Sequence, residues 1–278
     1  MESAPPRIMI GFSVSFIEFA LATLIPIYAG MFSVIVIGEV TKVRTRYLSA
    51  FALGLLFWFF FDTMNDAIQL GVNEGYTFDF HQTCLVLLFV TGFLLLTLLG
   101  GRTRVRDSLT GDNESSILVG ILAALGLGIH GFGEGLEFGA LAAGTQAVTV
   151  VDAIGGVGGG ISYFLHKLLE STIVVVVFLA AARTLSITTQ KQGRQIAVIG
   201  LIFSIPSLVG EAVAYYMPMN ATYFFAMGAG AAFSVALYVI KPIYGGRPED
   251  IDFSQWMGIS FSVLLGFFLL YGAALFHS

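Results

Sequence analysis

Eight stretches of the chain consist almost entirely of apolar residues, and each is long enough to cross a membrane. They cover approximately residues 10–39, 47–72, 83–100, 115–143, 159–182, 195–216, 221–241 and 255–276. A helix needs about 20 such residues to span roughly 30 Å of hydrocarbon. The pattern therefore predicts an all-α integral membrane protein with eight transmembrane helices.

The composition agrees with this class of protein. Hydrophobic residues make up 56% of the 278 positions and charged residues 11%, with a mean hydropathy of +0.87. A soluble domain carries charge on about a quarter of its positions. We therefore expect a lipid bilayer around the helices and no nucleic-acid partner, and a homodimer is left open. The single cysteine, Cys84, excludes a disulfide within the chain and a cysteine-based metal site.

The basic residues between the stretches are distributed very unequally. If the N-terminus is outside, the loops on the inner side hold most of the 13 Lys and Arg residues. These are Lys42, Arg44, Arg46, Arg102, Arg104, Arg106, Arg183, Lys191, Arg194, Lys241 and Arg247. The outer side holds only Arg7. Cytoplasmic loops are enriched in Lys and Arg, so the pattern predicts a multi-pass cell-membrane protein with both termini outside.

Short internal matches point to a repeated organisation. Residues 51–54 resemble residues 225–228, and residues 92–96 resemble residues 266–270, both at an offset of 174. Pro26 with Gly30 resembles Pro206 with Gly210 at an offset of 180. The matched stretches cross the membrane in opposite directions, as inverted repeats do in many transporters.

We therefore predict one transmembrane domain over residues 1–278 with a 3+2+3 organisation of its helices. The first repeat would cover residues 8–101 and the second repeat residues 195–277. A central pair of helices, residues 115–183, would lie between them in the chain.

The two central stretches carry the same polar pattern. One contains His130 and Glu134, the other His166 and Glu170, so each has His-x-x-x-Glu. Residues four apart lie on one face of a helix. With a rise of about 1.5 Å per residue, the four side chains fall roughly 18–27 Å from the inner ends of their helices. They therefore share one layer if the two helices are neighbours.

Two imidazoles and two carboxylates in a dry layer suit a borderline divalent cation. The sequence predicts zinc first, with cadmium, cobalt, iron and manganese as alternatives. The competing interpretation is a structural network of polar side chains. Each ionised group at mid-membrane costs about 2.5–3.5 kcal/mol. Such a cost favours a functional site over structural ties. The ionisable residues concerned are Glu134, Glu137, Lys167, Glu170 and Glu211.

These motifs resemble those of a known family. His-Gly-Phe-Gly-Glu-Gly at residues 130–135 is similar to the His-Asn-Phe-Pro-Glu-Gly signature of the ZIP family of divalent metal-ion transporters. His-Lys-Leu-Leu-Glu at residues 166–170 resembles that family's His-Glu-x-Pro-Glu. The eight spans, the outside termini and the 3+2+3 organisation also resemble the family.

The resemblance implies a set of site residues and a mechanism. The implied metal ligands are His130, Glu134, His166 and Glu170, and Glu211 resembles a glutamate that the family gives to a second, adjacent metal. The segment from Asp62 to Asp66 resembles a degenerate His-Leu-Leu-Pro-Glu, which makes both aspartates entrance candidates. The implied function is transport of metal toward the cytoplasm by alternating access. The first, fourth, fifth and sixth helices would move against the other four.

Two departures from the family bear on the number of metals. Gly131 stands where the family has an asparagine, and Lys167 where it has an acidic residue. The family's asparagine and acidic residue would both help to hold the second metal. We interpret Lys167 as a charge-compensating group that pairs with Glu170 and Glu211 and stands in for the missing ion, so that the site binds one metal. The alternative is that Lys167 reaches outward and contacts nothing in the site. Glu137 projects from nearly the same face as His130, about 10.5 Å further outward, and is a third entrance candidate.

Other functions fit less well. An intramembrane metalloprotease needs His-Glu-x-x-His, which neither helix contains. A desaturase needs more than the 4 histidines of this chain. A retinal protein using Lys167 would leave both paired histidines without a role. We therefore expect a carrier and not an enzyme, with a metal-binding membrane receptor or regulator as the alternative.

Overall fold

The computed structural model describes residues 11–41, 45–69, 80–110, 115–144, 155–181, 190–217, 219–244 and 251–275. Within these ranges the chain forms eight helices and no strand. They are α1 (Phe12–Thr41), α2 (Thr45–Gln69), α3 (Phe80–Thr110), α4 (Ser115–Gly144), α6 (Gly156–Ala181), α7 (Gln190–Tyr216), α8 (Thr222–Tyr244) and α9 (Phe253–Ala274). Each contains an apolar stretch of 19–27 residues, which is enough to span a membrane. The predicted all-α, eight-helix membrane protein is confirmed.

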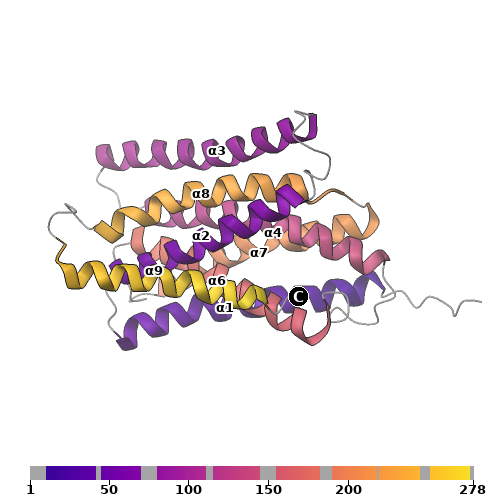
Figure 1. The fold of residues 1–278 in the computed structure, drawn as a ribbon, viewed down its shortest axis with the longest axis horizontal. Coiled ribbons are helices and arrows are strands. Elements are labelled where there is room, and N and C mark those ends of the chain that lie inside the picture. The colour runs from indigo at the N-terminus through magenta and orange to yellow at the C-terminus, as the bar shows by residue number, and fades with distance from the viewer. Residues whose placement is uncertain are drawn as a thin grey trace, which may run out of the picture.

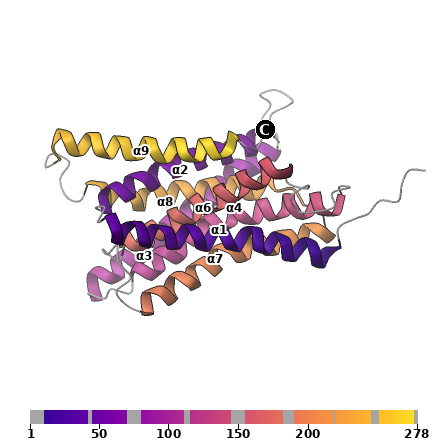
Figure 2. The same ribbon diagram turned by 90° about the horizontal axis from the view of Figure 1, so that it is seen from below.

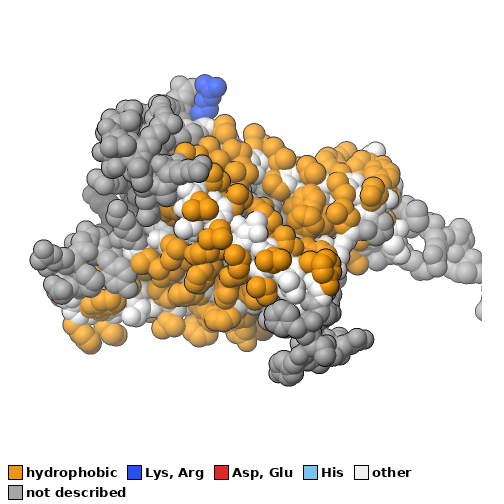
Figure 3. All heavy atoms as spheres, turned by 90° about the horizontal axis from the view of Figure 1, so that it is seen from above, with side chains coloured by type: hydrophobic (Ala, Val, Ile, Leu, Met, Phe, Trp, Pro, Cys, Tyr) orange, Lys and Arg blue, Asp and Glu red, His pale blue; other side chains and the backbone are white. Residues whose placement is uncertain are grey.

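The helices lie side by side with their axes in roughly one direction (Figures 1 and 2). In lipid a helix satisfies its own backbone hydrogen bonds, so long straight elements are the expected solution. The most extensive contacts join α4 with α7, α3 with α8, and α2 with both α8 and α9. α3 and α9 lie at the edges of the bundle and leave most of their apolar side chains exposed, among them Leu98 and Phe261. Figure 3 shows one such face, on which hydrophobic side chains dominate.

Glycines allow the helices to touch backbone to backbone. A Cβ added to Gly135 of α4 would collide with the carbonyl oxygen of Ser207 on α7. One added to Gly210 of α7 would collide with the carbonyl oxygen of Phe132 on α4. Small residues at helix contacts are the usual means of close packing in membranes. These contacts fix how α4 is rotated against α7, and hence where the side chains of residues 130 and 134 point.

The same contacts recur in two places of the bundle. Gly54 of α2 packs against the backbone of Val263 on α9, and Gly230 of α8 packs against the backbone of Phe89 on α3. Val263 follows Phe89 by 174 residues, which is the offset of the sequence match between residues 92–96 and residues 266–270. In these contacts Gly230 takes the place in α8 that Gly54 takes in α2. The sequence match of residues 51–54 with residues 225–228 instead aligns Gly54 with Gly228, two residues earlier. Positions in α2 and α8 therefore correspond at an offset of 176. The predicted repeat boundaries stay a prediction.

α4 and α6, which carry the two motifs, also contact a neighbouring helix through a glycine. Gly30 of α1 packs against the backbone of Leu168 on α6, as Gly210 of α7 packs against Phe132 on α4. Leu168 follows Phe132 by 36 residues, and His166 follows His130 by the same interval. The two His-x-x-x-Glu motifs thus occupy equivalent positions on two helices that are packed in equivalent ways.

Candidate metal centre

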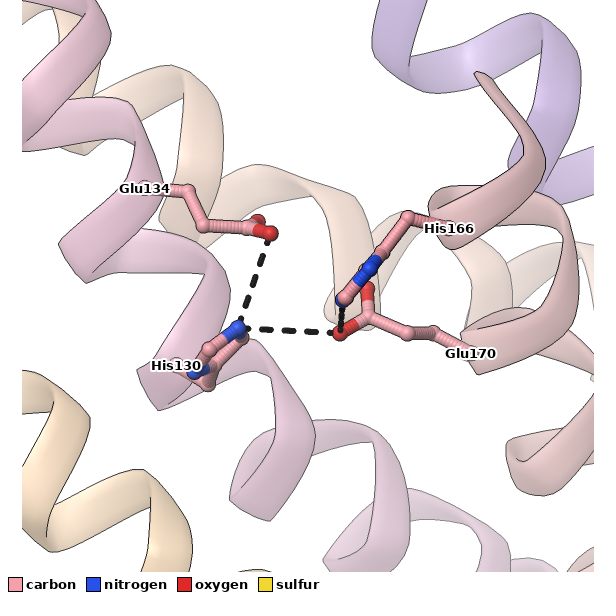
Figure 4. A group of neighbouring side chains, drawn as sticks. All are labelled: His130, Glu134, His166 and Glu170. Carbon is pink, nitrogen blue, oxygen red and sulfur yellow. Dashed lines mark ion pairs between the residues drawn. The ribbon is translucent and has the colours of Figure 1, made fainter. Parts of the chain in front are cut away.

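The four predicted ligands come together between α4 and α6. His130 and Glu134 point from α4 toward His166 and Glu170 on α6 (Figure 4). One ligand atom from each residue lies within 4.8 Å of the other three. His130 Nε2 is 3.5 Å from Glu134 Oε1 and 3.7 Å from Glu170 Oε1, and His166 Nε2 is 3.3 Å from Glu170 Oε1. The expectation that the two motifs share one layer is confirmed.

These spacings suit a small divalent cation. A tetrahedral ion with ligand distances of about 2.0–2.2 Å holds its ligand atoms about 3.4 Å apart. The three separations above lie close to that value, and no two of the four ligand atoms are more than 4.8 Å apart, so the longer edges of the site would contract around such an ion. His166 Nε2 and Glu170 Oε1 are buried and, apart from their 3.3 Å contact with each other, have no hydrogen-bond partner in the described part of the chain. Because buried polar atoms are normally satisfied, these two atoms are suited to act as metal ligands.

Lys167 is a fifth member of the cluster. Its side chain is fully buried, so the alternative in which it reaches outward is wrong. The ammonium pairs with Glu134 Oε2 and lies 2.7 Å from Glu170 Oε2. It also lies 5.9 Å from the ring centroid of Tyr163 and 5.8 Å from that of Phe203. Aromatic faces at such distances attract a cation.

Each carboxylate therefore has two distinct sides. Oε1 of Glu134 and Oε1 of Glu170 face the histidines, and Oε2 of each faces the ammonium of Lys167. Carboxylates that bridge two cations are arranged in this way, and here the ammonium of Lys167 stands where one of the two cations would be. The pairing of Lys167 with Glu134 has no signal in the sequence, because the two residues lie on different helices. The i, i+3 pairing with Glu170 was predicted.

Gly131 provides the room for this arrangement. A Cβ there would lie 3.8 Å from Lys167 Nζ and would collide with Ser207 Oγ on α7. A larger side chain at this position would push against both α7 and the ammonium. The two departures from the family motif, at residues 131 and 167, are therefore neighbours in space.

Glu211 lies outside the group of four. Its side chain is fully buried on α7, and Oε1 accepts a hydrogen bond of 3.0 Å from Ser15 Oγ on α1. Glu211 Oε2 has no hydrogen-bond partner among the described residues. The ion pairs of Lys167 run to Glu134 and Glu170, not to Glu211 as the sequence suggested.

The entrance candidates are also separate from the group. Glu137 is exposed on α4, and Asp62 is partly buried on α2. The side chain of Asp66 lies outside the described residues. Their proposed role at an entrance stays a prediction.

The comparisons with known proteins add no assignment. No protein-family model matches the chain, and no curated protein matches it.

Proposed function

We propose that the chain is a divalent metal-ion transporter of the ZIP type, with zinc as its first substrate and cadmium, cobalt, iron and manganese as alternatives. The observation that carries this proposal is the convergence of two imidazoles and two carboxylates in the middle of eight apolar helices. Carriers commonly hold their substrate near the bilayer midplane between bundles that move against each other. A site so placed is suited to exposing an ion to each side in turn.

The ion pairs of Lys167 support a single substrate ion. Two divalent ions that share bridging carboxylates repel strongly and need additional acidic groups. Here the ammonium already occupies the second side of both carboxylates. With neutral histidines, two carboxylates and one ammonium leave one negative charge, which attracts a dication. Glu137, Asp62 and Asp66 would draw cations toward the site.

The packing supports a division into two moving parts. One group comprises α1, α4, α6 and α7, in which both α6 and α7 pack against α1 and α4. The other comprises α2, α3, α8 and α9, in which α2 packs against α8 and α9, and α3 packs against α8. The first group carries His130, Glu134, His166, Lys167 and Glu170. We propose that this group moves against the second and delivers metal to the cytoplasm. The movement would occur across the contacts of α4 with α8 and α3, and of α6 with α2, α9 and α8.

The proposed orientation places both termini outside the cell. We expect an impermeant thiol reagent to label single cysteines at positions 77 and 218 in intact cells, and not at 104 or 191, in a chain that lacks Cys84. The basic loops are expected inside because of their Lys and Arg residues. Labelling of position 104 in sealed cells would show that this orientation is wrong.

Metal flux separates a transporter from a receptor that only binds metal. The purified protein in sealed proteoliposomes should accelerate Cd²⁺ or Zn²⁺ entry, measured with a trapped fluorescent indicator. Glu170→Gln should abolish this entry because it removes a ligand with little change of volume. Binding without flux in the unmodified protein would favour the receptor or regulator.

A further inference from the structure

The two histidines of the site occupy equivalent positions but differ in their surroundings. The ring of His130 packs edge-on against Phe59 of α2, with centroids 4.5 Å apart and planes at 66°. It also lies 5.1 Å from the ring of Phe225 on α8. For His166 the described contacts are Glu170 on its own helix and the ring of His130 at 6.4 Å. His130 thus makes ring contacts with residues of α2 and α8.

Thr63 makes the decisive contact with His130. Its side chain is fully buried on α2, and its Oγ1 lies 3.3 Å from His130 Nδ1. The other ring nitrogen, Nε2, faces the Oε1 atoms of Glu134 and Glu170. A metal-binding nitrogen must be free of a proton, so in the neutral ring the proton resides on Nδ1. In the metal-bound site Nδ1–H then donates to Thr63 Oγ1, because the ion takes the place of a proton on Nε2.

The position of α8 that corresponds to Thr63 carries no hydroxyl. At the offset of 176 that relates α2 to α8, Thr63 corresponds to Val239 and Phe59 to Val235. Both valines are fully or almost fully buried, with relative exposures of 1% and 0%. A valine has no atom that accepts a hydrogen bond. The hydroxyl of Thr63 is therefore a feature of only one half of the pseudo-symmetric site.

We propose that Thr63 is a positioning residue of the metal site, which fixes the orientation of His130 and keeps Nε2 free for the ion. The inference rests on the proposed metal site. Partners that bind the second nitrogen of a ligand histidine orient the ring and increase its basicity, and their loss typically costs 10–100-fold in metal affinity.

The hydrogen bond also crosses the proposed boundary between the two moving parts. α4 carries His130, and α2 belongs to the other group of helices. α2 and α4 otherwise have little contact. Metal affinity should therefore be highest while the Oγ1 of Thr63 faces Nδ1 of His130, and it should fall when α4 moves away from α2.

Calorimetric titration of the full-length protein with Cd²⁺ tests the inference. Thr63→Val, which keeps the shape of the side chain, should weaken binding by about 10–100-fold. Thr63→Ser should restore most of the affinity, because it restores the acceptor. The control is Ser49→Ala on the same helix, where the buried hydroxyl has no hydrogen-bond partner among the described residues. That variant should bind as the unmodified protein does.

Two further measurements separate positioning from general stability. The visible absorption of bound Co²⁺ reports ligand geometry, and it should change in Thr63→Val and return in Thr63→Ser. The melting temperature of each metal-free variant is measured in parallel. A lower melting temperature with unchanged Cd²⁺ affinity and Co²⁺ spectrum would overturn the positioning role. If Thr63→Val does not fold, Thr63→Ala is measured against the same criteria.

The outcomes also separate this inference from the proposed function. If the unmodified protein binds Cd²⁺ and loses it in His130→Ala but not in Thr63→Val, the metal site stands and the role of Thr63 is wrong. If the unmodified protein binds no divalent cation, both are wrong.

Discussion

Replacing any one of His130, Glu134, His166 or Glu170 with alanine should lower the affinity for Zn²⁺ or Cd²⁺ by more than about 100-fold. Loss of an outer partner of a ligand already costs 10–100-fold, and loss of the ligand itself should cost at least as much. All four ligand atoms lie within 4.8 Å of one another, so none of them is a remote contributor. Equilibrium binding to the purified variants, with radioactive or fluorescently reported metal, checks this expectation.

His81 provides a matched control for the histidine substitutions, and Glu137 tests the proposed entrance. His81 lies at the start of α3, where its Nδ1 is 2.9 Å from the hydroxyl oxygen of Tyr223. His81→Ala should leave metal affinity unchanged, and Glu137→Ala should weaken uptake chiefly at low metal concentration. Full binding by His166→Ala would show that the site between α4 and α6 is not the metal site.

Lys167→Glu should raise the binding capacity from one divalent ion per chain toward two. The substitution removes the ammonium that faces Oε2 of Glu134 and Glu170 and adds a carboxylate in the same place. Both changes favour a second cation on that side of the bridging carboxylates. The ratio of bound metal to protein, measured by elemental analysis after equilibrium dialysis, checks the result.

Two other variants make the result for Lys167 specific. Arg46→Glu makes the same change of charge at the start of α2, where Arg46 donates a hydrogen bond to Gln255, and it should leave one ion bound. Lys167→Ala removes one partner of a buried ion pair, which typically destabilises a protein by about 3–5 kcal/mol. Its metal-free form should melt at a lower temperature, and saturating metal should recover much of the loss. A capacity of one in Lys167→Glu would argue against the ammonium as a substitute for an ion.

The sequence was sufficient for the helices and for the convergence of His130, Glu134, His166 and Glu170. Apolar length alone identifies a membrane-spanning helix, because lipid leaves few other backbone structures open. The spacing of four residues places each histidine and glutamate on one face, and the shared depth brings the two pairs together. The boundaries were less accurate. The apolar stretch predicted to end at residue 100 is the first part of α3, which continues to Thr110. Charged residues mark the end of an apolar stretch, but they do not end a helix.

Contacts between helices could not be read in the same way. The pairing of Lys167 with Glu134 depends on how α4 and α6 are rotated, and the glycine contacts with α7 and α1 set that rotation. The sequence placed Glu211 beside Lys167, but α7 directs it toward Ser15 on α1. Thr63 lies in the segment from Asp62 to Asp66, which the sequence assigned to an entrance. Its contact with His130 depends on how α2 packs beside the site, which the sequence does not show.

The central claim is that one divalent ion binds between α4 and α6 through two imidazole nitrogens and two carboxylate oxygens. X-ray absorption at the zinc edge of the loaded, unmodified protein measures the ligand shell directly, with the metal-to-protein ratio determined on the same sample. The account predicts one zinc per chain with nitrogen and oxygen ligands at about 2.0–2.2 Å and two imidazoles in the shell. Two zinc ions per chain in this layer, or a shell without imidazole, would contradict it.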